Sequence, residues 1–317
     1  ARGVTSVVGV ALAPRALDYS RFNARLNRVD CEWLLGDLGA PVAGRRFDAV
    51  VSQPAYVPRP AAIDDTTYLH GGARGDELAL RLLGELAGLL GEHGRAWVLF
   101  DTPAARGQEL IARVRSALRE PALDTIVAAA PSVPTRGHAT AYATLVDPSL
   151  GAGYRAAVEH YTHHFRGQGI DALRHVLLHV EHARGDRASS VLLEPTSLRA
   201  IDGGVLRRVR AGVRLLAQGD AALLAAAVTP APGASLLYEE SLAGEPHSRT
   251  RVQIARGFEQ ELSDTAGALL QALRDHDSVR AAIAGYAALI DADPQEVAAG
   301  ALDFVRRGLA SGLLVSP

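Results

Sequence analysis

Two neighbouring stretches decide the fold: Arg46–Pro60 reads RFDAVVSQPAYVPRP, and Leu69–Leu83 reads LHGGARGDELALRLL. Residues 46–53 are an apolar run of strand length, and the strand should end at Pro54, because proline has no backbone N–H to pair in a sheet. The Pro- and Gly-rich segment 56–75 predicts a long loop over a site. Residues 76–90 have the apolar spacing of an amphipathic helix. This order is typical of an α/β sheet that binds its ligand where the strands end.

The pattern continues on both sides of this core. Pro14 stands in the first turn of an expected helix, a position where its missing N–H costs nothing. Further helices are expected at 76–90, 108–118 and 155–165, and strands at 5–12, 31–35, 46–53, 95–101, 123–130, 140–146 and 174–180. Alternating strands and helices predict a mostly parallel sheet, with two late strands forming an antiparallel edge.

After about residue 185 the pattern changes. Amphipathic helices are expected at 264–275, 278–290 and 295–307; Gly308 ends the last one, and a short GLLV strand follows. This order predicts a winged-helix-like module at about 257–317. We therefore expect an α/β domain over 1–184 and an α-rich C-terminal extension over 185–317.

Composition excludes several classes of protein. The formal net charge is −2 and the isoelectric point is about 6.6, which argues against a nucleic-acid binder. No charge-free apolar window of about 18 residues and no signal peptide is found, so a cytoplasmic location is expected. The single cysteine, Cys31, excludes an internal disulfide and a cysteine metal cluster. All 33 basic residues are arginine, which suggests a high-GC genome such as that of an actinobacterium.

The segments VVGVALAPRAL (7–17), GDL (36–38), 46–60 and 69–83 resemble the class I S-adenosylmethionine-dependent methyltransferases that act on release-factor glutamine, and related small-domain methyltransferases. The resemblance covers about residues 4–150. It implies a Rossmann-like sheet, with an acidic residue at the end of the family's second strand to hold the cofactor ribose.

The chain departs from that family at two motifs. The position of the ribose-binding acid is Ala11, which cannot accept hydrogen bonds from hydroxyls, and the next polar position of the family is Ala13. The family's substrate motif Asn-Pro-Pro-Tyr/Phe is replaced by Gln-Pro-Ala-Tyr at 53–56. Gln53 keeps the amide but carries it one methylene further out, and Tyr56 is kept. The resemblance therefore implies a changed substrate pocket and no cofactor; the alternative is S-adenosylmethionine.

The first strand of this chain matches the second strand of the family. The family's central strand, its glycine loop and the following helix have no counterpart, so the sheet is expected to lack its first central strand. Each buried backbone group left unpaired would cost about 1–3 kcal/mol. We therefore expect an obligate heteromer in which a small protein subunit supplies the strand; the alternative is an upstream part of the same polypeptide.

Candidate site residues gather around the expected strand-end cleft. Tyr56, Arg74, Asp76 and His138 are candidate catalytic residues, and candidate substrate-binding residues are Gln53, Pro54, His70, Gly71, Gly72 and Arg136. Arg74 suits a forked contact with an anion. Asp76 and Glu77 also suit a helix start, where acids are favoured structurally. Asp64 and Asp65 could supply a base or could simply be solvated.

The histidines at 160, 163, 164, 175, 179 and 182 resemble a metal cluster, since some are four residues apart. RHVLLHVEH is nevertheless better interpreted as a strand, with His175, Leu177 and His179 on one face. No metal site is predicted.

The leading functional hypothesis is a non-methylating subunit of a heteromeric tailoring enzyme in natural-product (antibiotic) biosynthesis. It would cyclise a small amino-acid-derived substrate, free or carrier-bound, with loss of an anionic leaving group. Heteromeric aziridine-forming enzymes of the azinomycin type are similar in outline. The alternatives are an N- or O-methyltransferase whose cofactor loop comes from a partner, and a non-catalytic scaffold subunit.

Overall fold

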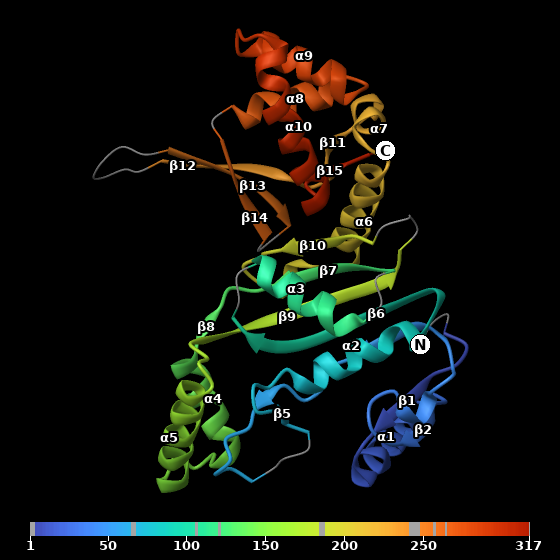
Figure 1. The fold of residues 1–317 in the computed structure, drawn as a ribbon, viewed down its shortest axis with the longest axis vertical. Coiled ribbons are helices and arrows are strands. Elements are labelled where there is room, and N and C mark those ends of the chain that lie inside the picture. Colours follow the sequence, from blue (N-terminus) through green and yellow to red (C-terminus); the bar gives the residue numbers. More distant parts are fainter. Residues whose placement is uncertain are drawn as a thin grey trace. The chain divides into compact units, whose positions relative to one another are not determined.

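The computed structural model describes residues 4–64, 68–104, 107–119, 122–183, 188–240, 248–255, 258–263 and 265–316. The chain divides into two compact units, one of Ala1–Val127 with Ser132–Leu192 and one of Ala128–Pro131 with Leu193–Pro317 (Figure 1). The candidate site residues all lie in the first unit. The predicted C-terminal module lies in the second unit.

The first unit is built on a mixed sheet with the strand order β10-β7-β9-β6-β3. These strands are β3 (Phe47–Ser52), β6 (Leu90–Pro103), β7 (Leu123–Ala129), β9 (Ala172–His182) and β10 (Ser190–Leu193), and β8 (Val133–Pro134) pairs with β9. β3 and β6 are parallel, whereas β6 and β9 are antiparallel. The sequence predicts that the antiparallel strands lie at an edge of the sheet, and this prediction is wrong. The antiparallel strand β9 lies inside the sheet, between β6 and β7.

The helices α2 (Glu77–Leu89) and α3 (Gly107–Leu118) pack on one another beside this sheet (Figure 1). α2 forms where the apolar spacing predicts it, with Ala79, Leu82, Leu83 and Leu86 buried on one face. Burial of that stripe is the main source of its stability, since an isolated helix of 13 residues is marginal in water.

The segment 140–146, predicted as a strand, belongs to helix α4 (Thr135–Val146). α4 packs against α5 (Ala152–Gly167). Ala139, Tyr142 and Ala143 are buried at the i, i+3, i+4 spacing of a helix and share one core cluster with Tyr161 of α5. Packing thus overrides the local strand preference of the threonine-rich sequence, as tertiary context commonly does.

The N-terminal residues form a separate two-stranded sheet. β1 (Val8–Ala11) and β2 (Glu32–Leu35) are parallel, in the register Val8↔Glu32, and are joined by α1 (Pro14–Leu26). The short helix η1 (Ala40–Val42) follows. Two contacts fasten this segment to α2: Gly39 N donates to Glu85 Oε2 at 2.8 Å, and Arg81 donates to Asp37 Oδ2 at 2.6 Å.

In the second unit, η2 (Leu198–Ala200), α6 (Gly203–Ala217) and α7 (Asp220–Ala225) precede a three-stranded antiparallel sheet of β12 (Ser235–Glu240), β13 (Ser248–Ala255) and β14 (Phe258–Leu262). The helices α8 (Ala266–Asp275), α9 (Val279–Leu289) and α10 (Pro294–Ser311) follow, and β15 (Leu314–Val315) pairs with β11 (Thr229–Pro230). The three helices and the final strand occur in the predicted order. A module beginning at about 257 would start inside the β12–β14 sheet, and the winged-helix assignment stays a prediction.

Within the described ranges, no helix combines the length and the apolarity that crossing a bilayer would require.

Candidate active site

The turn that follows β3 carries the Gln-Pro-Ala-Tyr motif. Gln53 Nε2 donates a hydrogen bond to the Tyr56 hydroxyl at 3.3 Å, and Pro54 between them is buried. After Tyr56 the chain enters β4 (Val57–Pro58), which pairs with β5 (His70–Gly72) in a second small parallel sheet. The motif therefore has a defined shape, set by the neighbouring β5.

Gly71 explains how β5 supports that turn. A Cβ at this position would lie 1.9 Å from the Gly75 carbonyl oxygen and 2.3 Å from that of Ala55. Only glycine permits this approach between backbones. Gly71, a candidate substrate-binding residue, thus lets β5 pack closely against the Gln53–Tyr56 turn, which is called the substrate turn below.

A polar cluster lies beside the turn and is called here the Asp101 cluster: Tyr56, Asp101, His138, Tyr142 and His175. Asp101 is 7% exposed near the end of β6, and His175 stands directly opposite it on β9. His175 Nδ1 hydrogen-bonds Asp101 Oδ1, and the Tyr142 hydroxyl donates to Asp101 Oδ2 at 3.2 Å. Asp101 thus holds one group on each carboxylate oxygen.

Tyr56 joins the substrate turn to this cluster. Its ring meets the His175 imidazole edge to face, with 6.0 Å between ring centroids. Through its hydroxyl it binds Gln53, as above. A substrate seated on the turn would therefore lie next to the carboxylate–imidazole pair.

His138 is one helical turn before Tyr142, and the two ring centroids are 5.4 Å apart. His138 Nε2 is buried and has no hydrogen-bond partner among the described residues. Burial lowers the pKa of His138; the charge of Asp101 opposes this shift, and His175 adds to it. Burial, then the charge and hydrogen bond of Asp101, raise the pKa of Tyr142 well above its usual range. The cluster therefore favours a neutral imidazole beside a protonated phenol.

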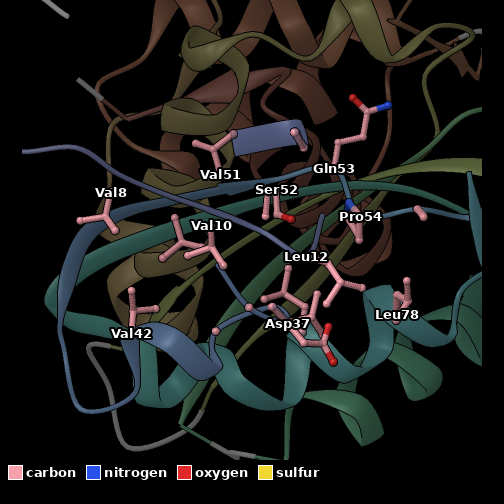
Figure 2. A pocket seen from close by; sticks show the side chains of 18 of the residues that line it. Val8, Val10, Leu12, Asp37, Val42, Val51, Ser52, Gln53, Pro54 and Leu78 are labelled. Carbon is pink, nitrogen blue, oxygen red and sulfur yellow. The ribbon is translucent and has the colours of Figure 1, made fainter. Parts of the chain in front are cut away.

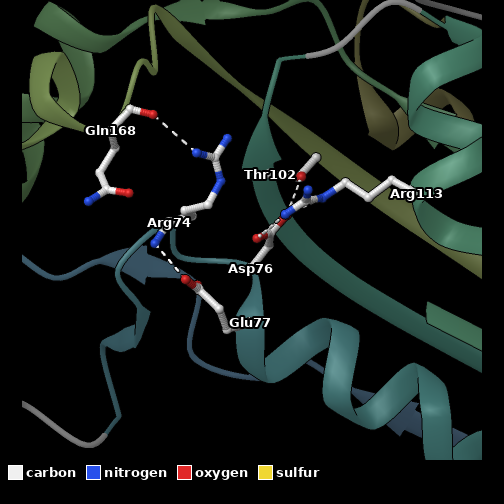
Figure 3. A network of polar contacts seen from close by, with 6 residues as sticks. All are labelled: Arg74, Asp76, Glu77, Thr102, Arg113 and Gln168. Atoms are coloured by element: carbon white, nitrogen blue, oxygen red, sulfur yellow. Dashed lines mark hydrogen bonds and ion pairs between the residues drawn. The ribbon is translucent and has the colours of Figure 1, made fainter. Parts of the chain in front are cut away.

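Asp76, predicted as a catalytic residue, is placed elsewhere. Its carboxylate is fully buried and accepts hydrogen bonds from Arg113 Nε at 2.9 Å, from Arg113 Nη2 at 2.8 Å, and from Thr102 Oγ1 at 2.5 Å (Figure 3). All of these bonds tie the start of α2 to β6 and α3. A carboxylate paired in this way is a structural ion pair.

Arg74 and Glu77 also serve the local fold. Arg74 Nη1 donates to the Gln168 carbonyl at the end of α5, at 3.1 Å, and the Arg74 backbone N–H donates to Glu77 Oε1 at 2.8 Å (Figure 3). The second bond is a cap at the start of α2. The sequence predicts a forked contact of the Arg74 guanidinium with an anion. In the structure, its Nη1 instead binds a carbonyl at the end of helix α5.

The remaining predicted residues are spread around the cluster. His70 is 6% exposed, and its Nε2 lies 3.3 Å from the Tyr161 hydroxyl, whose pKa burial raises to about 12. Arg136 and Asp64 are exposed, and Asp65 lies outside the described residues.

The histidines with metal-like spacing do not gather into a metal site in the described part of the chain, where no group of three His, Cys, Asp or Glu side chains is arranged to hold a metal ion. Those at 160, 163 and 164 lie on α5. Those at 175, 179 and 182 lie on β9, which confirms the strand interpretation.

Sequence reasoning missed two members of the cluster. Asp101 ends a predicted strand, and an acid at that place is a signal that could have been used. Tyr142 was not recognised as a site residue, because its segment was predicted as a strand and is a helix. His175 was considered only as a metal ligand, since nothing in the sequence shows that it stands opposite Asp101.

A cavity of about 920 Å³ separates β1 from β3 (Figure 2). Its walls are mainly apolar, and its polar lining includes Arg15, Asp37, Ser52 and Gln53. Gln53 therefore belongs both to this cavity and to the substrate turn.

The resemblance puts a cofactor ribose at the carboxyl end of β1, so the residues there can be tested against it. Ala11 and Ala13 present only methyl groups to the cavity, and Asp37 Oδ2 is taken up by Arg81. A ribose needs a carboxylate facing its two hydroxyls. At the end of β1 the cavity lining thus has two alanine methyl groups where the family has acidic and polar side chains.

The chain therefore contains an α/β domain with a mixed sheet. The Asp101 cluster lies on β6 and β9 of this sheet, next to the substrate turn. No family model matches the chain. Over 102 residues it is 31% identical to the Methanocaldococcus jannaschii protein "Putative protein N5-glutamine methyltransferase MJ0928"; the match covers 31% of this chain and 51% of that protein, so the chain spans about half of its relative.

Solved structures give weaker similarities. The ribosomal protein L11 methylase of Lactobacillus delbrueckii subsp. bulgaricus is 16% identical, covering 57% of this chain and 60% of that one, with a TM-score of 0.31. The [4+2]-cyclase SpnF is 16% identical, covering 58% and 68%, with a TM-score of 0.34.

Proposed function

We propose that this chain carries the substrate site of a methyltransferase-like enzyme that does not methylate. The reaction is the intramolecular cyclisation of a small amino-acid-derived amine, as in aziridine formation, within natural-product biosynthesis. The observation that carries the proposal is the contact of the Gln53–Tyr56 turn with the Asp101–His175 pair. Amide and phenol groups there can orient an amine, and the cluster beside it can manage its proton.

The amine nitrogen forms a bond to the neighbouring carbon that carries a sulfate or phosphate ester. The C–O bond of that carbon breaks, and its electron pair leaves with the oxygen as the free anion. The proton of the amine passes to a base of the protein.

The absence of an acceptor at Ala11 supports a reaction that does not use S-adenosylmethionine. In a cyclisation, both reacting atoms already belong to one molecule. The protein then needs to supply orientation, a base and stabilisation of the leaving charge.

The free strand edges support a partner. Among the described residues, β1 pairs only with β2, β3 pairs only with β6, and both line the same cavity. In Figure 2, Val8, Val10 and Leu12 follow one another in the same direction as Val51, Gln53 and Pro54. A strand of a small partner subunit, parallel to both and apolar on both faces, would pair these edges.

Exposed apolar side chains agree with this partner. Val51 on the edge strand β3 is 78% exposed, and Phe22 and Leu26 on α1 are 62% and 70% exposed. Hydrogen exchange tests whether a partner strand pairs with β1 and β3. It is measured for the chain alone and for the chain co-expressed with small proteins encoded by adjacent genes. Strong protection of amides in 8–11 and 47–52 only in the complex is expected. Equal protection in the chain alone, as a stable monomer, would overturn the partner.

The chemistry is tested on the co-expressed complex with amino acids that carry a sulfate or phosphate ester vicinal to the amine. Expected products are the inorganic anion and a ring compound lighter by the acid lost. The corresponding esters that carry hydrogen in place of the amine are the matched control, because they have no nitrogen to close the ring, and they should release no anion. If none of the esters releases the anion and forms a ring compound, the proposed cyclisation is wrong.

The second candidate is an N- or O-methyltransferase, favoured by the 31% identity over 102 residues to a protein named for glutamine methylation. Calorimetric titration of the complex with S-adenosylmethionine separates the two. Micromolar binding would support the methyltransferase and contradict the proposal above.

A further inference from the structure

We infer that His138 is the catalytic residue that receives the proton of the substrate amine, and that Asp101 is the positioning residue that holds the cluster around it. This inference rests on the proposed function for its substrate. It rests on the geometry of the Asp101 cluster for the role of each residue.

The hydrogen bonds of the cluster leave one acceptor open. Asp101 accepts from Tyr142 at one oxygen and binds His175 Nδ1 at the other. Tyr142 gives its proton to Asp101 and is held in its protonated form. These groups satisfy one another, whereas His138 Nε2 is buried without a partner. An unmade hydrogen bond of a buried polar atom is costly, and active sites are a common place for one.

The protonation state of His138 suits a base. Its pKa is lowered by burial, so the imidazole is neutral near pH 7 and its open nitrogen can accept a proton. Once it accepts, the nearby charge of Asp101 favours the imidazolium, since Asp101 acts to raise the same pKa. The carboxylate thus assists the charged form through its charge, without taking the proton.

Three members of the Asp101 cluster act on His138. The charges of Asp101 on β6 and His175 on β9 shift its pKa in opposite directions, and Tyr142 contacts its ring from the same helix. Asp101 is the only acid acting on His138 among the described residues. Removal of its charge therefore has a definite sign: the pKa of His138 must fall further.

The experiment reads His138 directly. The complete complex is labelled with ¹³C-histidine and titrated by NMR, and the signal of His138 is identified by its loss in His138→Gln. The expected midpoint is below 6.5 and moves lower in Asp101→Asn. Thr144→Ala, an exposed and uncharged change on the same helix, should leave the midpoint in place. A midpoint at or above 6.5, or no response to Asp101→Asn, would overturn the inference.

Turnover gives the second readout. Loss of a general base should lower kcat by about 10²–10⁴-fold in His138→Ala, with little change in KM, and added imidazole should restore part of the rate. His163→Ala, an exposed change on α5, is the control. An unchanged rate in folded His138→Ala would refute the base. Because the titration needs no substrate, a failed cyclisation assay with the expected titration counts against the proposed function alone.

Discussion

Asp101 and His175 stand directly opposite each other on the antiparallel strands β6 and β9, with His175 Nδ1 hydrogen-bonded to Asp101 Oδ1. Seventy-four positions separate them in the chain, and the sheet register alone brings them together. The pair sits beside Tyr56 of the substrate turn. This relationship places a strand-end carboxylate and a histidine of an inner strand beside the turn, where they hold the Asp101 cluster together.

Asp76→Asn should be strongly destabilising. Asp76 is fully buried, and its loss leaves Arg113, whose side chain is 34% exposed, without its counter-charge. Breaking a buried pair costs about 3–5 kcal/mol, and partial exposure of Arg113 puts the expected loss near 3 kcal/mol. Urea denaturation measures it. Asp37→Asn breaks an exposed ion pair and should cost less than about 1 kcal/mol; equal losses would contradict the structural role of Asp76.

Gly71→Ala should disrupt the substrate turn. The added Cβ would collide with the backbone of Ala55 and Gly75, which cannot move aside as a flexible side chain can. Thermal denaturation should show a clear loss of stability. Gly88→Ala is the matched control, because a Cβ there has open space within helix α2, and it should stabilise by about 0.5–1 kcal/mol. If both changes stabilise, the close packing of β5 on the turn is wrong.

Tyr142→Phe should remove one hydrogen bond to Asp101, at a cost of about 1 kcal/mol near neutral pH. The folded state raises the pKa of Tyr142 above its ordinary value of 10.0, so it favours the protonated phenol. That contribution is complete below pH 10.0 and is lost as the pH rises further, because the unfolded chain ionises first. Chemical denaturation across this range should show the wild type losing stability faster than Tyr142→Phe. Parallel curves would count against the raised pKa.

The stability should also depend on His138 at acid pH. Its folded pKa lies below the ordinary value of 6.5, so the unfolded chain binds the proton first as the pH falls. Stability contributed by neutral His138 is therefore present above pH 6.5 and is lost on acidification through the folded pKa. His138→Gln should lack this part of the acid loss, whereas the exposed control His163→Gln should keep it. The midpoints of urea curves from neutral to acid pH provide the measurement.

Much of the fold can be predicted from local sequence. The strand ending at Pro54, the amphipathic helix α2 and the three C-terminal helices follow from apolar spacing and from residues that end or cap an element. Asp293 and Ser278, for example, accept backbone hydrogen bonds at the starts of α10 and α9. The segment 140–146 could not be predicted in this way, because its helix is decided by packing against α5.

The sequence by itself determined the substrate turn, the alanines at the end of β1 and most of the strands and helices, because these depend on neighbours along the chain. Only the tertiary structure decided which polar residues meet. Asp76 pairs with Arg113 and stabilises the fold, whereas Asp101 binds His175 and belongs to the candidate site. The physical reason is that a buried charge must find its partner across the core, and sheet register and helix packing, which no local pattern records, determine that partner.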